Sequence, residues 1–129
     1  MTTQQSAGPA PTDLRTDTLR VGPVSACLLA GDLTIDTERQ AARALAAALH
    51  GGPAVLAVDL ADVELFTCSG LNQLLVARRH AAAQGTDLVL VAPSRFVRRV
   101  LEITETTSLF CVVESIDAVA EDAVGRAAP

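Results

Sequence analysis

Residues 54–71, AVLAVDLADVELFTCSGL, decide the fold of this chain. The stretch opens with five apolar residues that end at Asp59, and an apolar run of this length after a Gly-Gly-Pro turn indicates a buried strand. A short loop follows, and the residues from Ser69 onward place Leu71, Leu74 and Leu75 on one face of a helix. The stretch therefore predicts a strand, a loop and a helix whose first turn carries a hydroxyl.

The rest of the chain repeats this alternation. We expect a hairpin of strands 19–21 and 24–30, a helix to residue 49, the strand 54–58, a helix from Ser69, a strand 87–92, a short helix after Pro93-Ser94, a strand 110–113 and a last helix from Ser115. Right-handed crossovers between such elements build a mostly parallel sheet. The predicted fold is α/β, with a four- to five-stranded sheet, an antiparallel edge from the N-terminal hairpin and about four helices. Strand 54–58, apolar at every position, belongs at the sheet centre.

Chain length and local composition predict one domain. Residues 1–17 mix Thr, Gln, Ser, Pro and Gly without periodicity and are expected to be a disordered tail, as are residues 125–129. Residues 18–124 then form the domain, and a chain of 129 residues buries enough surface to fold without a disulfide or a metal.

Charge and composition argue against several classes of function. A net charge of −5, no lysine, ten scattered arginines and only three phenylalanines give no surface suited to nucleic acid. No apolar run is long enough to span a membrane, and no signal peptide is visible, so we expect a cytoplasmic protein without membrane contact. Cys27, Cys68 and Cys111 form no C-x-x-C pair, which suits reduced thiols, and Cys27 and Cys111 are expected to be core residues.

The hydroxyl of Ser69 has two interpretations. Serine at a helix start commonly caps the free N–H groups, and the same N–H groups and the positive end of the helix dipole also favour an added phosphate. A hydrolase is not expected, because the G-x-S-x-G pattern is absent. No residue is expected to be catalytic, and no metal or cofactor site is indicated. Cys68 offers an alternative, since a thiol before a helix start can act as a redox switch.

Three loops are expected at the edge where the parallel strands end. They are residues 31–36, 61–69 and 92–94. Partners and ligands of open α/β sheets meet the loops at the carboxyl ends of the strands, so this edge is the predicted functional surface.

The same three loops carry a family resemblance. Asp59-Leu-x-x-Val63-x-Leu-Phe66-x-Cys-Ser69-Gly70-Leu71 resembles the signature D-L-S-x-V-x-F-x-D-S-S/T-G-L of the STAS family, the domain of bacterial anti-sigma factor antagonists. Leu28-Leu-x-Gly31-Asp32-Leu33 is similar to its L-x-G-E-L-D segment, and Leu88-x-Leu-x-x-Pro93-Ser94-x-x-Val97 resembles its third landmark. The resemblance spans about residues 19–124.

The resemblance implies an anti-sigma factor antagonist that binds a serine-kinase-type anti-sigma factor, as a monomer or weak dimer. It implies phosphorylation of Ser69 as the switch, with ATP and metal belonging to the kinase. The expected partner surface consists of Gly31, Asp32, Thr34, Thr67, Cys68, Ser69, Gly70, Leu71 and Ser94.

Two positions depart from the family pattern. Thr67 and Thr34 stand where the antagonists usually carry aspartates that are associated with phosphorylation. Asp36 is a candidate replacement for the second of these. The alternatives are a STAS scaffold that is not phosphorylated, within a signalling or lipid-transport assembly, and the thiol switch at Cys68.

Overall fold

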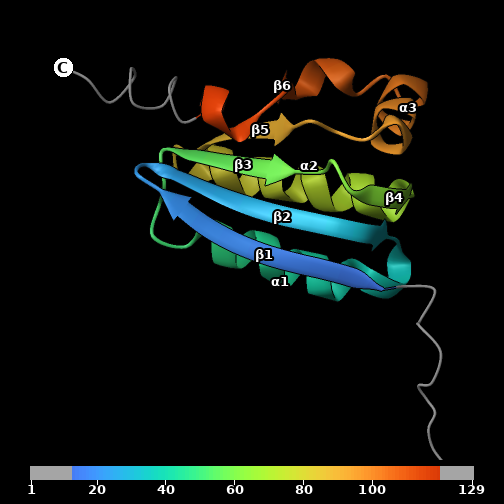
Figure 1. The fold of residues 1–129 in the computed structure, drawn as a ribbon, viewed down its shortest axis with the longest axis horizontal. Helices are drawn as coiled ribbons and strands as arrows, with labels where there is room; N and C mark the ends of the chain where they lie inside the picture. The colour runs from blue at the N-terminus through green and yellow to red at the C-terminus, as the bar shows by residue number, and fades with distance from the viewer. Residues whose placement is uncertain (1–12, 120–129) are drawn as a thin grey trace, which may run out of the picture.

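The computed structural model describes residues 13–119 of the chain, which form a twisted sheet flanked by helices (Figure 1). The described elements are β1 (Leu14–Val21), β2 (Val24–Leu33), η2 (Ile35–Thr37), α1 (Glu38–Leu49), β3 (Val55–Asp59), β4 (Val63–Phe66), α2 (Cys68–Ala83), β5 (Asp87–Val91), α3 (Arg95–Ile103), η3 (Thr107–Leu109) and β6 (Cys111–Val113). Residues 116–119 are helical as well. None of the helices in this described part is long and apolar enough to cross a bilayer.

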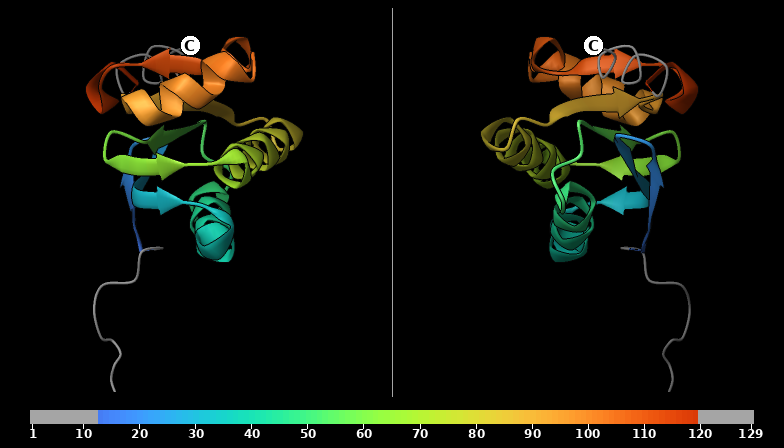
Figure 2. Two further views of the ribbon diagram at one scale, coloured as in Figure 1. Left: turned by 90° about the vertical axis from the view of Figure 1, so that its right-hand side faces the viewer. Right: turned by 90° about the vertical axis from the view of Figure 1, so that its left-hand side faces the viewer.

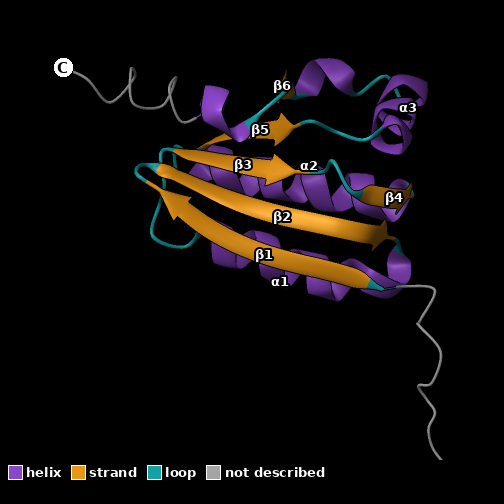
Figure 3. Ribbon diagram, in the orientation of Figure 1, coloured by secondary structure: helices purple, strands orange, loops and turns teal. Residues whose placement is uncertain are grey.

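The sheet has the predicted α/β topology. Its strand order is β1-β2-β3-β5-β6, and β4 pairs with β2 outside this path. β1 and β2 form the antiparallel hairpin, and every other pair is parallel (Figure 3). β3 lies between β2 and β5, which confirms its predicted place at the centre.

Two cores cover the two faces of β3. Helices α1 and α2 lie on one side of the sheet (Figure 2), and on this side Leu56 and Val58 pack into the large cluster that α1, α2 and α3 share with the sheet. On the other side Val55 and Ala57 pack with Val119. Because successive side chains of a strand point to opposite faces, burial on both sides explains why this strand is apolar throughout.

The hairpin begins earlier than the sequence predicts. β1 starts at Leu14, which is buried, and its eight residues pair with β2 from Leu14 opposite Gly31 to Val21 opposite Val24. Residues 14–17 therefore belong to the fold, which corrects the expected tail boundary at residue 17. The remaining β1 side chains are exposed, so backbone pairing holds this strand and an apolar pattern does not reveal it. Residues 1–12 and 120–129, including the predicted C-terminal end 125–129, lie outside the described residues.

A sixth strand, β4, occupies part of the segment expected to be a loop. It pairs with the end of β2 after a register shift between Gly31 and Asp32. Gly31 has φ +109°, and a Cβ there would lie 2.6 Å from the Asp13 carbonyl oxygen, so the bulge requires glycine. The pairing brings the start of α2, which follows β4 directly, beside the end of β2.

Candidate functional site

The loops that carry the predicted site residues lie at one edge of the sheet. The arrowheads of β2, β3 and β5 point to the same end of the sheet, where η2, β4 and α3 also lie (Figure 1). The loops that carry the predicted site residues therefore share one edge, as expected for parallel strands.

Ser69 is the second residue of α2, and its hydroxyl does not cap the helix. It donates a 2.8 Å hydrogen bond to Oε1 of Glu38, the first residue of α1. Both side chains are half-buried. The capping interpretation of Ser69 is therefore wrong for this chain, and the bond joins the starts of two neighbouring helices. Sequence reasoning missed Glu38, although an acidic residue in the first turn of a crossover helix is the available signal.

Thr67 occupies the N-cap position of α2 without capping it through its side chain. Its hydroxyl instead donates to the Leu33 carbonyl oxygen at 3.2 Å, and its N–H donates to the same oxygen at 3.1 Å. The first-turn N–H groups of α2 thus receive no capping oxygen from Thr67, and the positive end of the helix dipole lies beside the Ser69 hydroxyl.

Gly70 and Leu71 are buried, so they belong to the packing beneath Ser69 and are not accessible to a partner. A Cβ on Gly70 would lie 2.9 Å from the Leu33 Cβ and 2.9 Å from ring atoms of Phe66. Glycine is therefore required here by close packing of α2 against the ends of β2 and β4. This contact sets the position of Ser69.

Thr34 is also buried, which contradicts its expected place on the partner surface. Its Oγ1 accepts from the Asp36 N–H at 3.2 Å, and its own N–H donates to Thr37 Oγ1 at 3.0 Å, which makes a capping box over η2. The Thr34 side chain is thus already hydrogen-bonded within the turn that precedes α1. Gly31 is buried as well, whereas Asp32 is half-buried.

Ser94 lies at the same edge but caps a different helix. Its Oγ accepts from the Val97 N–H at 3.4 Å at the start of α3, and its N–H donates to the Leu60 carbonyl oxygen at 3.1 Å. No hydrogen bond within residues 13–119 joins it to Ser69. The accessible members of the predicted surface are therefore Asp32, Thr67, Cys68, Ser69 and Ser94.

Three exposed apolar side chains also lie at this edge, and sequence reasoning missed them. Ile35 in η2 is 70% exposed, Leu65 in β4 is 48% exposed, and Phe96 at the start of α3 is 41% exposed. The Arg95 guanidinium lies over the Phe96 ring, 4.9 Å from its centroid. Exposed apolar groups with a polar surround are typical of surfaces that bind proteins.

Residues 23–111, well over half of the chain, match the family model described as Mlab, STAS domain. The chain belongs to the STAS domain family. None of the curated proteins compared with this sequence matches it.

Solved structures with this STAS fold include an anti-sigma factor antagonist from Mycobacterium paratuberculosis, with 24% identity, a TM-score of 0.78 and coverage of 90% of this chain and 97% of that one. The anti-sigma factor antagonist SpoIIAA in its unphosphorylated form shows 18% identity, a TM-score of 0.70 and coverage of 89% and 100%. SpoIIAA of Bacillus in its phosphorylated form shows 17% identity, a TM-score of 0.64 and coverage of 87% and 99%. At these identities the likeness establishes the fold.

The three thiols of this STAS domain have different environments. Cys27 is buried, as predicted, and burial raises the pKa of its thiol to about 12. Cys111 is exposed, so its predicted place in the core is wrong. Cys68, next to Ser69, is exposed. Within the described ranges no group of histidine, cysteine and acidic residues is arranged to hold a metal ion.

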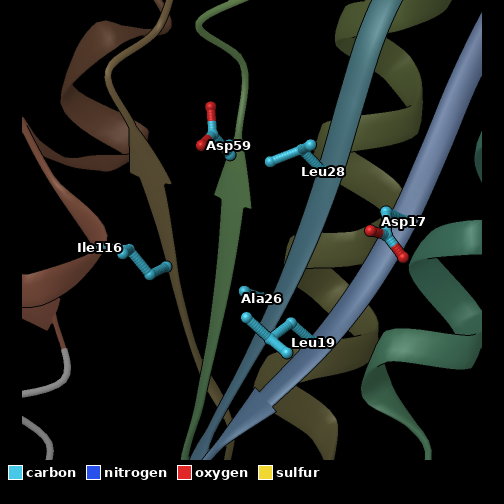
Figure 4. Close-up of a pocket in the computed structure, with 6 residues that line it drawn as sticks. All are labelled: Asp17, Leu19, Ala26, Leu28, Asp59 and Ile116. Carbon is cyan, nitrogen blue, oxygen red and sulfur yellow. The ribbon is translucent and has the colours of Figure 1, made fainter.

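A concave feature of the STAS domain lies on the sheet face opposite α1 and α2 (Figure 4). Figure 4 shows this shallow hollow, which is lined by Leu19, Ala26, Leu28 and Ile116, with the carboxylates of Asp17 and Asp59 at its margin. One oxygen of Asp59 accepts from the Ala61 N–H at 3.0 Å. The hollow carries no nucleophile, so the candidate site remains the edge around Ser69.

Proposed function

We propose that this STAS domain is an anti-sigma factor antagonist that is switched off by phosphorylation of Ser69. The observation that carries the proposal is the placement of the Ser69 hydroxyl. It lies at the positive end of α2, is not used as a cap, and shares its edge of the sheet with exposed apolar side chains.

The comparisons support this proposal. The M. paratuberculosis protein and SpoIIAA are described as anti-sigma factor antagonists, and SpoIIAA has been solved with and without phosphate. The sequence signature around Ser69 and the shared fold point to the same class of protein. The partner on this proposal is a serine-kinase-type anti-sigma factor, which supplies ATP and metal, and the antagonist regulates transcription without touching DNA.

The mechanism follows from the charge of phosphoserine. The unmodified edge buries Ile35, Leu65 and Phe96 against the partner, which favours association. A phosphate adds a charge of about −1.5 to −2, and the dipole of α2 stabilises it by only about 0.3–1 kcal/mol. In the interface the same group loses its water and meets any acidic group of the partner, effects that together cost several kcal/mol. Phosphorylation therefore releases the partner and preserves the fold.

A second candidate is a STAS scaffold that is not phosphorylated. It is favoured by Thr34 and Thr67, which lack the family's carboxylates and whose hydroxyls are engaged by backbone groups. The matching family model, described as Mlab, STAS domain, is consistent with such a subunit. The exposed Cys68 thiol keeps the third alternative, a redox switch, open to test by alkylation.

The experiment uses every serine-kinase-type anti-sigma factor encoded in the same genome as this chain. Each purified kinase is incubated with MgATP and the wild type, Ser69→Ala or Ser94→Ala, and the products are read by intact mass and peptide mapping. The proposal predicts one phosphate on Ser69 in the wild type and in Ser94→Ala, and none in Ser69→Ala. A wild type that no kinase modifies, recovered from cells within a larger assembly, supports the scaffold.

A further inference from the structure

The hydrogen bond between Ser69 and Glu38 points to a role for Glu38 that rests on the proposed function. We propose that Glu38 positions the Ser69 hydroxyl for phosphoryl transfer and accepts its proton. The bond is 2.8 Å long and joins residues 31 positions apart in the sequence. Within the described residues, it is the one hydrogen bond that the Ser69 side chain makes.

Glu38 is held in place by the turn before it. Thr37, directly preceding, donates its hydroxyl to the Asp32 carbonyl oxygen at 2.8 Å and accepts from the Thr34 N–H at 3.0 Å. These bonds fix η2 to the end of β2, so α1 begins at a defined point. A reacting group held by a rigid element keeps a favourable geometry without further ordering.

The other polar residues of this edge do not supply a carboxylate to Ser69. Asp36 is exposed, and its bond to Thr34 uses its backbone N–H. Thr34 is buried in the capping box, and the Thr67 hydroxyl is directed to the Leu33 carbonyl oxygen. Glu38 therefore supplies the negative group that this chain lacks at positions 34 and 67, and Asp36, the replacement suggested by the sequence, does not.

The geometry suits an attacking hydroxyl. Because the Ser69 O–H points at Glu38, the oxygen lone pairs are directed away from it and are available to phosphorus. In the proposed step, Ser69 Oγ forms a bond to the γ-phosphorus of ATP held by the kinase. The bond from that phosphorus to the β–γ bridging oxygen breaks, and ADP leaves with the electron pair. The hydroxyl proton passes to the Glu38 carboxylate and then to water.

The kinetic test compares Glu38→Gln with Asp36→Asn. The amide of glutamine keeps an acceptor oxygen but removes the charge and the basicity, and Asp36→Asn removes one charge two residues away on the exposed surface. With the kinase that modifies the wild type, Glu38→Gln is expected to lower the maximal rate by about 100-fold, the lower end of proton-transfer contributions. KM for the antagonist stays within about twofold in both variants, because Glu38 acts on the reacting oxygen and not on association. Asp36→Asn keeps the wild-type rate.

A second readout needs no kinase. In ¹H–¹⁵N spectra, Glu38→Gln is expected to shift the Ser69 amide resonance from its wild-type position, whereas Asp36→Asn leaves it in place, because the hydrogen bond joins Glu38 to Ser69. If the shift is present and the wild type is phosphorylated, yet Glu38→Gln reacts at the wild-type rate, the inference is overturned and the proposed function stands. Absence of the shift overturns the inference whatever the kinase does. A wild type that no kinase modifies overturns the proposed function.

Discussion

Replacement of Gly70 by alanine tests the packing that positions Ser69. The added methyl would lie 2.9 Å from the Leu33 Cβ and 2.9 Å from ring atoms of Phe66, and both side chains are buried, so neither can swing into solvent. Forcing an extra methyl into such a space costs about 1–3 kcal/mol. The helix propensity of alanine returns at most about 1 kcal/mol, and less in a first turn. We therefore expect Gly70→Ala to lose about 1–2 kcal/mol.

The assay is urea unfolding at 25 °C, with Asn72→Ala as the matched control in the same helix. Asn72 is exposed, and surface substitutions of this kind change stability by about 0.5 kcal/mol or less. A Gly70→Ala variant as stable as the wild type would refute the close contact of α2 with β2 and β4. The same result would refute the position of Ser69 that this contact sets. The variant should also be phosphorylated more slowly, because relief of the clash moves the start of α2.

Three further expectations concern the sheet and its core. Leu56→Ala, at a fully buried site of β3, should lower the free energy of unfolding in urea by about 2–5 kcal/mol. Leu28→Ala, at a site on β2 that is 42% exposed, should lower it much less. A loss below about 1 kcal/mol for Leu56→Ala would contradict the central position of β3. The Cys27 thiol stays protonated in the folded state up to pH about 12 but ionises near 9 when unfolded, so folded protein binds the extra proton and stability falls as pH rises between these values. The wild type should therefore lose up to about 1.4 kcal/mol per pH unit more than Cys27→Ala there, and parallel curves would refute the buried thiol. A chain that begins at residue 18 should melt below one that begins at Asp13, because it lacks residues 14–17 of β1; equal melting temperatures would show that these residues do not pair.

The sequence predicts the centre of the sheet better than its margins. Residues 54–58 are apolar throughout because two cores cover β3, and such a run is readable from composition. The first half of β1 cannot be predicted in this way. Its exposed residues, Arg15, Thr16 and Asp17, show no apolar alternation, because this part of the strand is stabilised by pairing with β2. β4 is only four residues long, and its partner, the end of β2 beyond the bulge, is distant in sequence.

The candidate site is also predicted only in part. The loops at the strand ends follow from the α/β alternation, and Ser69 follows from the signature around it. The hydrogen-bond partner of the Ser69 hydroxyl cannot be predicted from the sequence, because Glu38 is brought close only by the packing of α1 beside α2. Local rules assign a helix-start hydroxyl to capping. Here tertiary contacts override them, with Thr67 directed to Leu33 and Ser69 to Glu38.

The most direct test of the proposed switch is a binding titration of the anti-sigma kinase with each state of the antagonist. The unmodified wild type and Ser69→Ala should bind, and the wild type phosphorylated on Ser69 should bind at least about tenfold more weakly, since a loss of about 1.4 kcal/mol already gives that factor. Far-ultraviolet circular dichroism of the phosphorylated protein should match the unmodified one, because the fold is preserved. Equal affinity of the two states, or a phosphate that Ser69→Ala still acquires, would contradict the account.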